Sequence, residues 1–155
     1  SEPVHHCNDC FADGQSLFVS MFSGSGNWKR DSFDGTIAEY DLESGERLRD
    51  LVTTLWMPHN VEIIEDSMHV LDSLRGQLKF NNFSVQASWN SFTRGLDYDG
   101  TMYAVGLSKN RNHSKLLGIS DNVSIDCGIS LYLPEIGVSR TIALPRFDDI
   151  HSITY

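Results

Sequence analysis

The sequence predicts an all-β chain made of β-propeller blades, and three observations lead to this prediction. Short β-branched and aromatic runs alternate with turn dipeptides such as Asp13-Gly14, Asp34-Gly35 and Asp99-Gly100. Helical spacing of apolar residues is nearly absent, with the segment 45–56 as the exception. A hairpin-sized unit also recurs along the chain, and this repeat favours a propeller over a sandwich or a barrel.

The recurring unit aligns residues 6–20 with residues 59–73 without a gap, so that His6 falls on His59. A third copy at 93–108 follows with about one residue of slack. The first two copies are 53 residues apart and the second and third about 35. Propeller blades run about 40–50 residues, so this spacing is typical of blades.

We therefore expect one domain over residues 1–155 that contains about three four-stranded antiparallel blades. The expected blades cover approximately 5–58, 59–92 and 93–149, and 150–155 supplies a final strand that starts or completes another blade. Propellers close with about four to eight blades, so three blades leave two open edges. We expect two copies to pair as a homodimer into a six-bladed ring, of which this chain is half. A fragment of a longer gene is the alternative.

Two long connections, 22–34 and 108–122, each follow the second strand of a blade and are expected to emerge on the same rim. Loops of this length in a compact domain are usually functional or mobile. Trp28, in the first loop, and Trp56 are candidates for a binding rim or an interface. Lys109 and Arg111, at the root of the second loop, are candidates to attract an anionic ligand.

The composition argues against several classes of partner. The 12 Lys and Arg residues against 21 Asp and Glu give a formal net charge of −9, and no basic run exists. Nucleic acids and anionic membranes need clustered basic residues, so we expect neither as a partner. Three cysteines are too few for a disulfide scaffold, and the first residues show no signal-peptide pattern, which favours the cytoplasm.

The segment "VHHCNDC" at 4–10 places two histidines and two cysteines close together, as in a zinc site. In a strand over 5–11, side chains alternate between the two faces. Cys7 and Cys10 are then expected on opposite faces, which argues against a chelate or a redox pair. No second C-x-x-C exists to complete a closed zinc site.

One residue of each repeat is expected at the mouth of a central channel. His6, His59, Arg94 and His151 share this position at the start of an innermost strand, and Asn8 shares the face of His6. His6, His59 and His151 predict either a polar channel lining or a site for a divalent metal such as zinc or calcium. Arg94 would bind an anionic group through paired hydrogen bonds.

Three motifs carry a resemblance that covers nearly the whole chain: Pro58-His59, the stretch 92–96 "FTRGL" and the stretch 105–109 "VGLSK". In these the chain resembles an uncharacterised bacterial β-propeller family, whose members are roughly twice as long. The resemblance implies a propeller fold for this chain, similar to the C-terminal half of the family, and no established activity. A looser similarity to six-bladed propellers with catalytic metal centres carries over only His59, as a zinc ligand.

Two functions of different classes follow from these observations. The first is a module that binds a small molecule or a protein through its channel mouth and long loops. The second is a metal-dependent lyase or hydrolase that uses His6, His59 and His151, with Arg94 to position the substrate. We favour the binding module.

Overall fold

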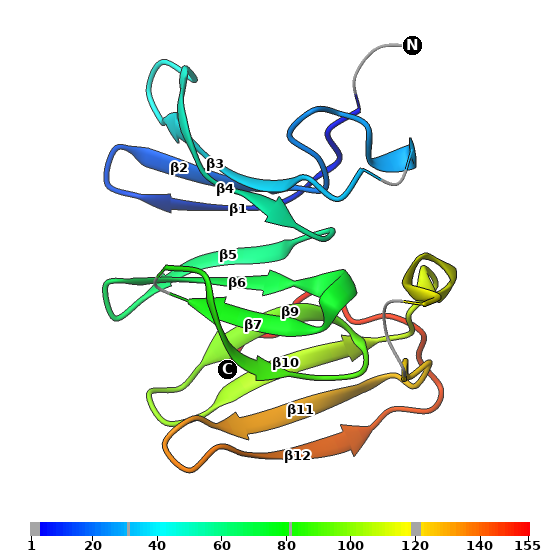
Figure 1. Ribbon diagram of the computed structural model, residues 1–155. Coiled ribbons are helices and arrows are strands. Elements are labelled where there is room, and N and C mark those ends of the chain that lie inside the picture. The colour runs from blue at the N-terminus through cyan, green and yellow to red at the C-terminus, as the bar shows by residue number, and fades with distance from the viewer. Residues whose placement is uncertain (1–3, 31, 81, 119–121) are drawn as a thin grey trace.

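Three four-stranded antiparallel sheets make up almost all the regular structure of the chain (Figure 1). The structure, a computed structural model, describes residues 4–30, 32–80, 82–118 and 122–155. Helical structure in these residues is confined to three short 3₁₀ turns, η1 (Trp28–Arg30), η2 (Ser73–Arg75) and η3 (His113–Leu116). No helix in the described ranges is long and apolar enough to cross a membrane. The prediction of an all-β chain with four-stranded antiparallel units is confirmed.

Each sheet is a meander of four consecutive strands. The first contains β1 (Cys7–Asp13), β2 (Ser16–Met21), β3 (Gly35–Asp41) and β4 (Arg47–Leu55). The second contains β5 (His59–Ile64), β6 (Ser67–Asp72), β7 (Gln77–Phe80) and β8 (Ser84–Ser88). The third contains β9 (Phe92–Tyr98), β10 (Tyr103–Ser108), β11 (Gly128–Leu133) and β12 (Val138–Ala143). In every sheet the first strand lies at one edge and the fourth at the other.

The segment with helical spacing, 45–56, contains strand β4. Ile37 of β3 pairs with Val52, whereas the next residue, Ala38, pairs with Asp50. Such shifts in register place extra residues in β4 and break the simple alternation of faces. The apolar residues of β4 therefore recur at a spacing that imitates a helix.

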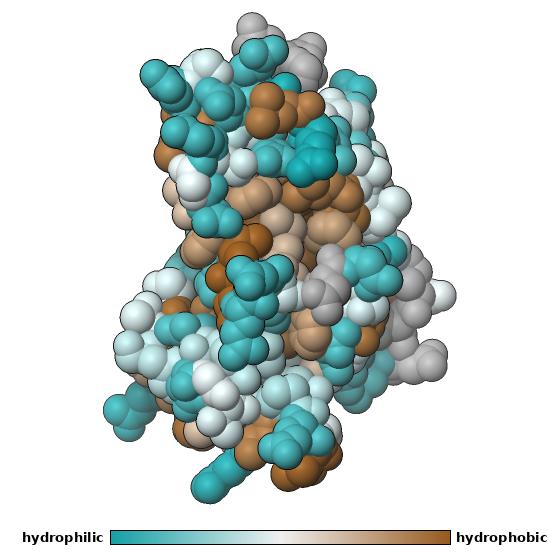
Figure 2. Space-filling view, turned by 90° about the vertical axis from the view of Figure 1, so that its left-hand side faces the viewer, coloured by the Kyte–Doolittle hydropathy of each residue, from teal (hydrophilic) through white to brown (hydrophobic). Residues whose placement is uncertain are grey.

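The sheets are packed face to face, with β1 beside β5 and β5 beside β9 (Figure 1). Strand β6 is buried on both faces, because Val70 packs towards the first sheet and Leu71 towards the third. The consecutive apolar residues Val70 and Leu71 therefore point to opposite faces, and both are fully buried. Viewed from the left of Figure 1, apolar surface gathers at the level where the first two sheets meet (Figure 2).

Polar contacts also connect neighbouring sheets. The ring Nε2 of His69 lies 2.9 Å from the hydroxyl of Tyr103 in the third sheet. The indole Nε1 of Trp89 donates a hydrogen bond of 2.8 Å to Oγ of Ser130. Buried polar groups are costly unless they are paired, so these contacts favour one register of sheet against sheet.

The segment 150–155, expected as a final strand, forms no strand in the structure. It lies along β9 and β10 and is held there largely through side chains. The backbone N–H of Ile150 donates to Ser108 Oγ at 2.9 Å, and that of Tyr155 donates to Asp97 Oδ2 at 2.7 Å. Side-chain acceptors therefore replace the backbone ladder that a strand requires.

The long connections leave the sheets on one side, the right-hand side of Figure 1. The first follows β2 and the second follows β10, and the segment from 144 to 149 turns back at the same side. Residue 31 of the first connection and residues 119–121 of the second lie outside the described part of the chain. This shared rim brings distant segments together.

Truncation of the apolar interface between the second and third sheets tests this packing. Leu78 is fully buried there, whereas Leu42 is 47% exposed in the β3–β4 turn. We expect Leu78→Ala to lower the free energy of unfolding by about 2–5 kcal/mol. Leu42→Ala should change it by no more than about 0.5 kcal/mol. Urea denaturation measures both values, and equal stability of the two variants would contradict the packing.

Candidate binding site

A pocket of about 440 Å³ opens at the rim where the long connections leave the sheets. Four of the five residues expected at a channel mouth line it: His6, His59, Arg94 and His151. They come from the residue before β1, from β5, from β9 and from the C-terminal segment. The structure thus brings together one residue of each repeat.

Asn8, the fifth expected residue, is not part of the pocket lining. Its side-chain Nδ2 donates a 3.0 Å hydrogen bond to the carbonyl oxygen of Pro58. This bond connects β1 to the turn that precedes β5, so the contact that Asn8 makes is a structural one.

The first strand of each sheet is irregular near its start, beside the pocket. The pairing register shifts between Cys7 and Asp9 in β1 and between His59 and Val61 in β5. In the third sheet it shifts opposite Gly106, where β9 carries Arg94 and Gly95. An extra residue of this kind bends a strand and redirects its side chains, and such bulges are common next to functional sites.

Two glycines make the irregularity in β9 sterically feasible. Gly95 has a φ of +78°, and its N–H donates to Oδ1 of Asn60 at 2.8 Å. A Cβ atom at Gly106 would lie 1.9 Å from the carbonyl oxygen of Arg94. Glycine is therefore required at both positions, which explains the motifs "RGL" and "VGL" in physical terms. Through them β9 presents Arg94 to the pocket.

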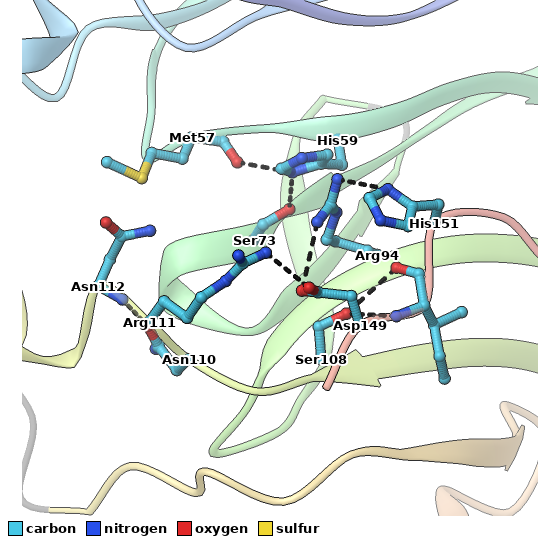
Figure 3. A network of polar contacts seen from close by, with 11 residues as sticks. Met57, His59, Ser73, Arg94, Ser108, Asn110, Arg111, Asn112, Asp149 and His151 are labelled. Carbon is cyan, nitrogen blue, oxygen red and sulfur yellow. Dashed lines mark hydrogen bonds and ion pairs between the residues drawn. The ribbon is translucent and has the colours of Figure 1, made fainter. Parts of the chain in front are cut away.

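The C-terminal segment supplies a carboxylate that joins two guanidinium groups (Figure 3). Nη2 of Arg111 donates to Oδ2 of Asp149 at 2.6 Å, and Nη1 of Arg94 lies 3.5 Å from Oδ1. The backbone around Asp149 is fixed, because Lys109 N–H donates to the Asp148 carbonyl at 2.8 Å. Two arginines from different parts of the chain are thus held side by side.

Positive charge exceeds negative charge in the pocket lining. Arg94, Lys109 and Arg111 line it together with one carboxylate, that of Asp149, and Lys109 also pairs at 3.6 Å with Asp148, which is not a lining residue. Burial, and then repulsion from Arg94, lowers the pKa of His59 to about 3. The same two causes lower the pKa of His6. The His59 imidazole is therefore neutral near pH 7, and the charge of the pocket resides on arginine and lysine.

Aromatic rings form the apolar part of the lining. The His6 ring stacks on Phe22 with centroids 4.4 Å apart, and Trp28 meets His6 edge-on at 4.8 Å. The His59 ring lies edge-to-face with Phe92 at 5.3 Å. Phe22 and Phe92 are buried and form the base, whereas Trp28 is half-buried at the side.

The loop that carries Trp28 is organised by one carboxylate. Oδ1 of Asp34 accepts a 2.5 Å hydrogen bond from Ser23 Oγ, and Oδ2 accepts one of 2.9 Å from the Ser25 N–H. These hydrogen bonds lower the pKa of Asp34, although burial opposes them and is the largest single influence. The ionised carboxylate thus fixes both ends of the loop around Trp28.

Two buried donors in this lining have no hydrogen-bond partner among the described residues. They are Nε of Arg94 and the indole Nε1 of Trp28. Most buried N–H groups in native proteins are paired. Both nitrogen atoms are buried, so they are donors that the described part of the fold leaves unpaired.

The hydroxyl near His59 is a structural partner of the imidazole. Nδ1 of His59 lies 2.9 Å from Oγ of Ser73 and 3.2 Å from the Met57 carbonyl (Figure 3). Ser73 is fully buried, and its Oγ also donates to the Leu71 carbonyl at 3.4 Å. The pair orients the ring and does not present a nucleophile to the pocket.

His6, His59 and His151, the expected metal ligands, line the pocket without forming a metal-binding cluster. Within the described ranges no group of three or more His, Cys, Asp or Glu residues is arranged to hold a metal ion. Nη2 of Arg94 donates to Nδ1 of His151 at 2.8 Å. That bond uses the lone pair a metal would need and places a positive charge beside it.

The expectation that Cys7 and Cys10 point to opposite faces is wrong. Cys7 pairs with Met21 and Cys10 with Val19, which are two residues apart on β2 and share a face. The irregularity in β1 adds a residue between the cysteines, so both side chains project from the same face. Both thiols are exposed, whereas Cys127 is buried.

Sequence reasoning missed Phe22, Phe92 and Asn112 as lining residues. Phe92 precedes Arg94 by two positions, so strand alternation alone could have assigned it to the same face. Asn112 lies in an irregular loop and Phe22 beyond the end of β2, where no periodic pattern applies.

No protein-family model and no curated protein matches the chain. Among solved structures, it is similar to a computationally designed protein, Ika8, with a TM-score of 0.57 and 10% sequence identity. The likeness covers 97% of this chain and 40% of the designed chain. The chain therefore spans about two fifths of the length of that protein, and the similarity concerns the fold alone.

Carboxylates on the three first strands predict an unusual pH dependence of stability. Burial raises the pKa of Glu62 in β5 to about 7, and Asp97 and Asp9 add to the effect. Between the ordinary value of 4.5 and about 7, the folded state holds this proton more tightly than the unfolded state. The contribution of Glu62 to stability therefore falls as the pH rises through this window.

We expect Glu62→Gln to flatten the pH profile of the melting temperature between about pH 4.5 and 7. Glu43→Gln, at an exposed position in the β3–β4 turn, is the control. Thermal denaturation followed by circular dichroism at several pH values compares the two. Identical profiles for both variants would show that Glu62 does not carry the effect.

Proposed function

We propose that the three sheets are consecutive blades of a β-propeller that binds a small molecule in the pocket at the rim. The meander order of each sheet and the adjacency of β1, β5 and β9 support the assignment to blades. The similarity in fold to a longer, designed chain is compatible with it.

The observation that carries the proposal is the pocket at the rim, in which distant segments converge. Its volume of about 440 Å³ lies within the range of about 300–1,000 Å³ that is usual for small-molecule sites. It has a buried aromatic base and a few fixed polar groups, as such sites do. Protein partners usually bind broader surfaces, which makes a small molecule the better fit.

The polar groups of the pocket support binding more than catalysis. Arg94 and Arg111 are held by Asp149, and the hydroxyl next to His59 is inaccessible. Donors fixed in this way recognise a ligand without themselves forming or breaking bonds.

Nuclear magnetic resonance with a library of small ring-containing fragments tests the proposal. We expect fragments to shift the indole N–H signal of Trp28, whose Nε1 is unpartnered. The indole signal of Trp89 should stay in place, because that group already donates to Ser130. The indole signal that disappears in Trp28→Phe is assigned to Trp28.

A steric variant provides the control for this experiment. Asn112→Phe should fill the pocket and abolish the shifts, whereas Asn82→Phe, at an exposed position in the β7–β8 turn, should not. A library in which no fragment moves the Trp28 signal would remove the proposed site.

We propose further that two copies close the ring through the outer faces of the first and third sheets. Ile142 on β12 pairs with Ile129 on the outer face of the third sheet and is 45% exposed. An apolar open sheet face of this kind favours association.

Light scattering on a size-exclusion column should give about twice the 17.4 kDa chain mass. Ile142→Lys should return the protein to a monomer. Leu42→Lys, at a turn position of similar exposure (47%), should leave the dimer intact. A monomeric parent protein would contradict pairing between copies.

A further inference from the structure

We infer that the pocket binds a flat ring that carries an oxyanion, a carboxylate or a phosphate. This inference rests on the proposed function and specifies the chemical class of its ligand. It is carried by the charge, the free donors and the aromatic surfaces of the pocket.

The charge distribution favours an anion. The chain as a whole has a formal charge of −9, yet three cationic side chains and one carboxylate line the pocket. A local excess of positive charge in a recess raises the concentration of anions there and repels cations. The pocket thus has the opposite sign to the chain that surrounds it.

The guanidinium groups of Arg94 and Arg111 are held in place, and at least one of their N–H donors is left unpaired within the described part of the chain. Asp149 contacts Nη1 of Arg94 and Nη2 of Arg111, and His151 accepts from Nη2 of Arg94. Nε of Arg94 is left without a partner among the described residues. Oriented guanidinium N–H groups suit the oxygens of carboxylates and phosphates, which accept charge-assisted hydrogen bonds.

His151 adds a donor by virtue of its tautomer. A guanidinium group can only donate, so Nδ1 of His151 must accept the bond from Arg94. The ring proton then lies on Nε2, which makes this nitrogen a donor. An acceptor-rich ligand group matches it.

The remaining lining suits a planar ring. The stacked pair of His6 and Phe22 and the ring of Trp28 supply aromatic surface to the lining. Trp28 also has a buried Nε1 without a hydrogen-bond partner among the described residues. A purely apolar ligand would leave this donor and that of Arg94 unpaired, which is costly.

A matched series of small compounds tests the inference. Benzoate and phenyl phosphate supply the ring with an oxyanion, benzamide supplies a neutral ring, and benzylamine supplies a cationic one. We expect both anions to titrate the Trp28 indole signal and to bind about tenfold more tightly than benzamide. Benzylamine should bind more weakly than benzamide. Added NaCl should lower the affinity for the two anions only. Inorganic phosphate should bind more weakly than phenyl phosphate.

A charge variant with a close control identifies the residue responsible. Arg111→Gln should lower the affinity for benzoate and for phenyl phosphate about tenfold and leave the affinity for benzamide unchanged. Arg49→Gln is the control, because Arg49 is 68% exposed against 65% for Arg111, and each makes a 2.6 Å carboxylate pair. Isothermal titration calorimetry measures the affinities, and circular dichroism confirms that both variants are folded.

The outcomes separate this inference from the proposed function. If neutral and anionic rings bind the pocket equally well, the ligand does not need an oxyanion and this inference is wrong, whereas the proposed binding function still holds. If inorganic phosphate binds as tightly as phenyl phosphate, the ring contributes nothing to binding and this part of the inference is wrong. No shift of the Trp28 signal with any compound of the series or the fragment library would overturn the inference together with the proposed site.

Discussion

The close approach of β9 to β10 at Gly106 is the constraint on which the site depends. The Arg94 carbonyl occupies the space that a side chain at position 106 would need, so β9 departs from the regular ladder there. The departure is stabilised from the next sheet, because Asn60 accepts the N–H of Gly95. Asn60 of the second sheet thus holds the irregular part of β9 in the third sheet in place. Arg94, which lies in this part of β9, lines the pocket.

The pocket arises because every sheet is the same kind of meander. The connection after each second strand leaves the sheet at the same end, and each first strand begins at that end. Face-to-face stacking then brings these loops and strand starts into one recess. The C-terminal segment completes it, since Asp149 reaches both Arg94 and Arg111 (Figure 3).

Charge in the molecule is divided between this recess and the first strands. At the rim, burial and then repulsion from Arg94 lower the pKa of His59 to about 3 and keep its imidazole neutral. Further along the first strands, Asp9, Glu62 and Asp97 are near enough to raise the pKa of Glu62. Burial sets both effects, because desolvation disfavours the charged form of an acid and of a base alike.

The sequence by itself determined the all-β class, the four-stranded units and the repeat that relates His6, His59 and Arg94, whereas His151 lies in a segment that forms no strand. Strand alternation, turn dipeptides and repeat spacing are local signals, and they need no knowledge of neighbouring sheets. Only the tertiary structure decided which faces these residues share. The added residue in β1 breaks the alternation, so Cys7 and Cys10 project from the same face and Asn8 binds the Pro58 carbonyl outside the pocket. The meeting of Arg111 with Asp149 was equally beyond the sequence, because 38 residues separate them and only packing of the C-terminal segment brings them together.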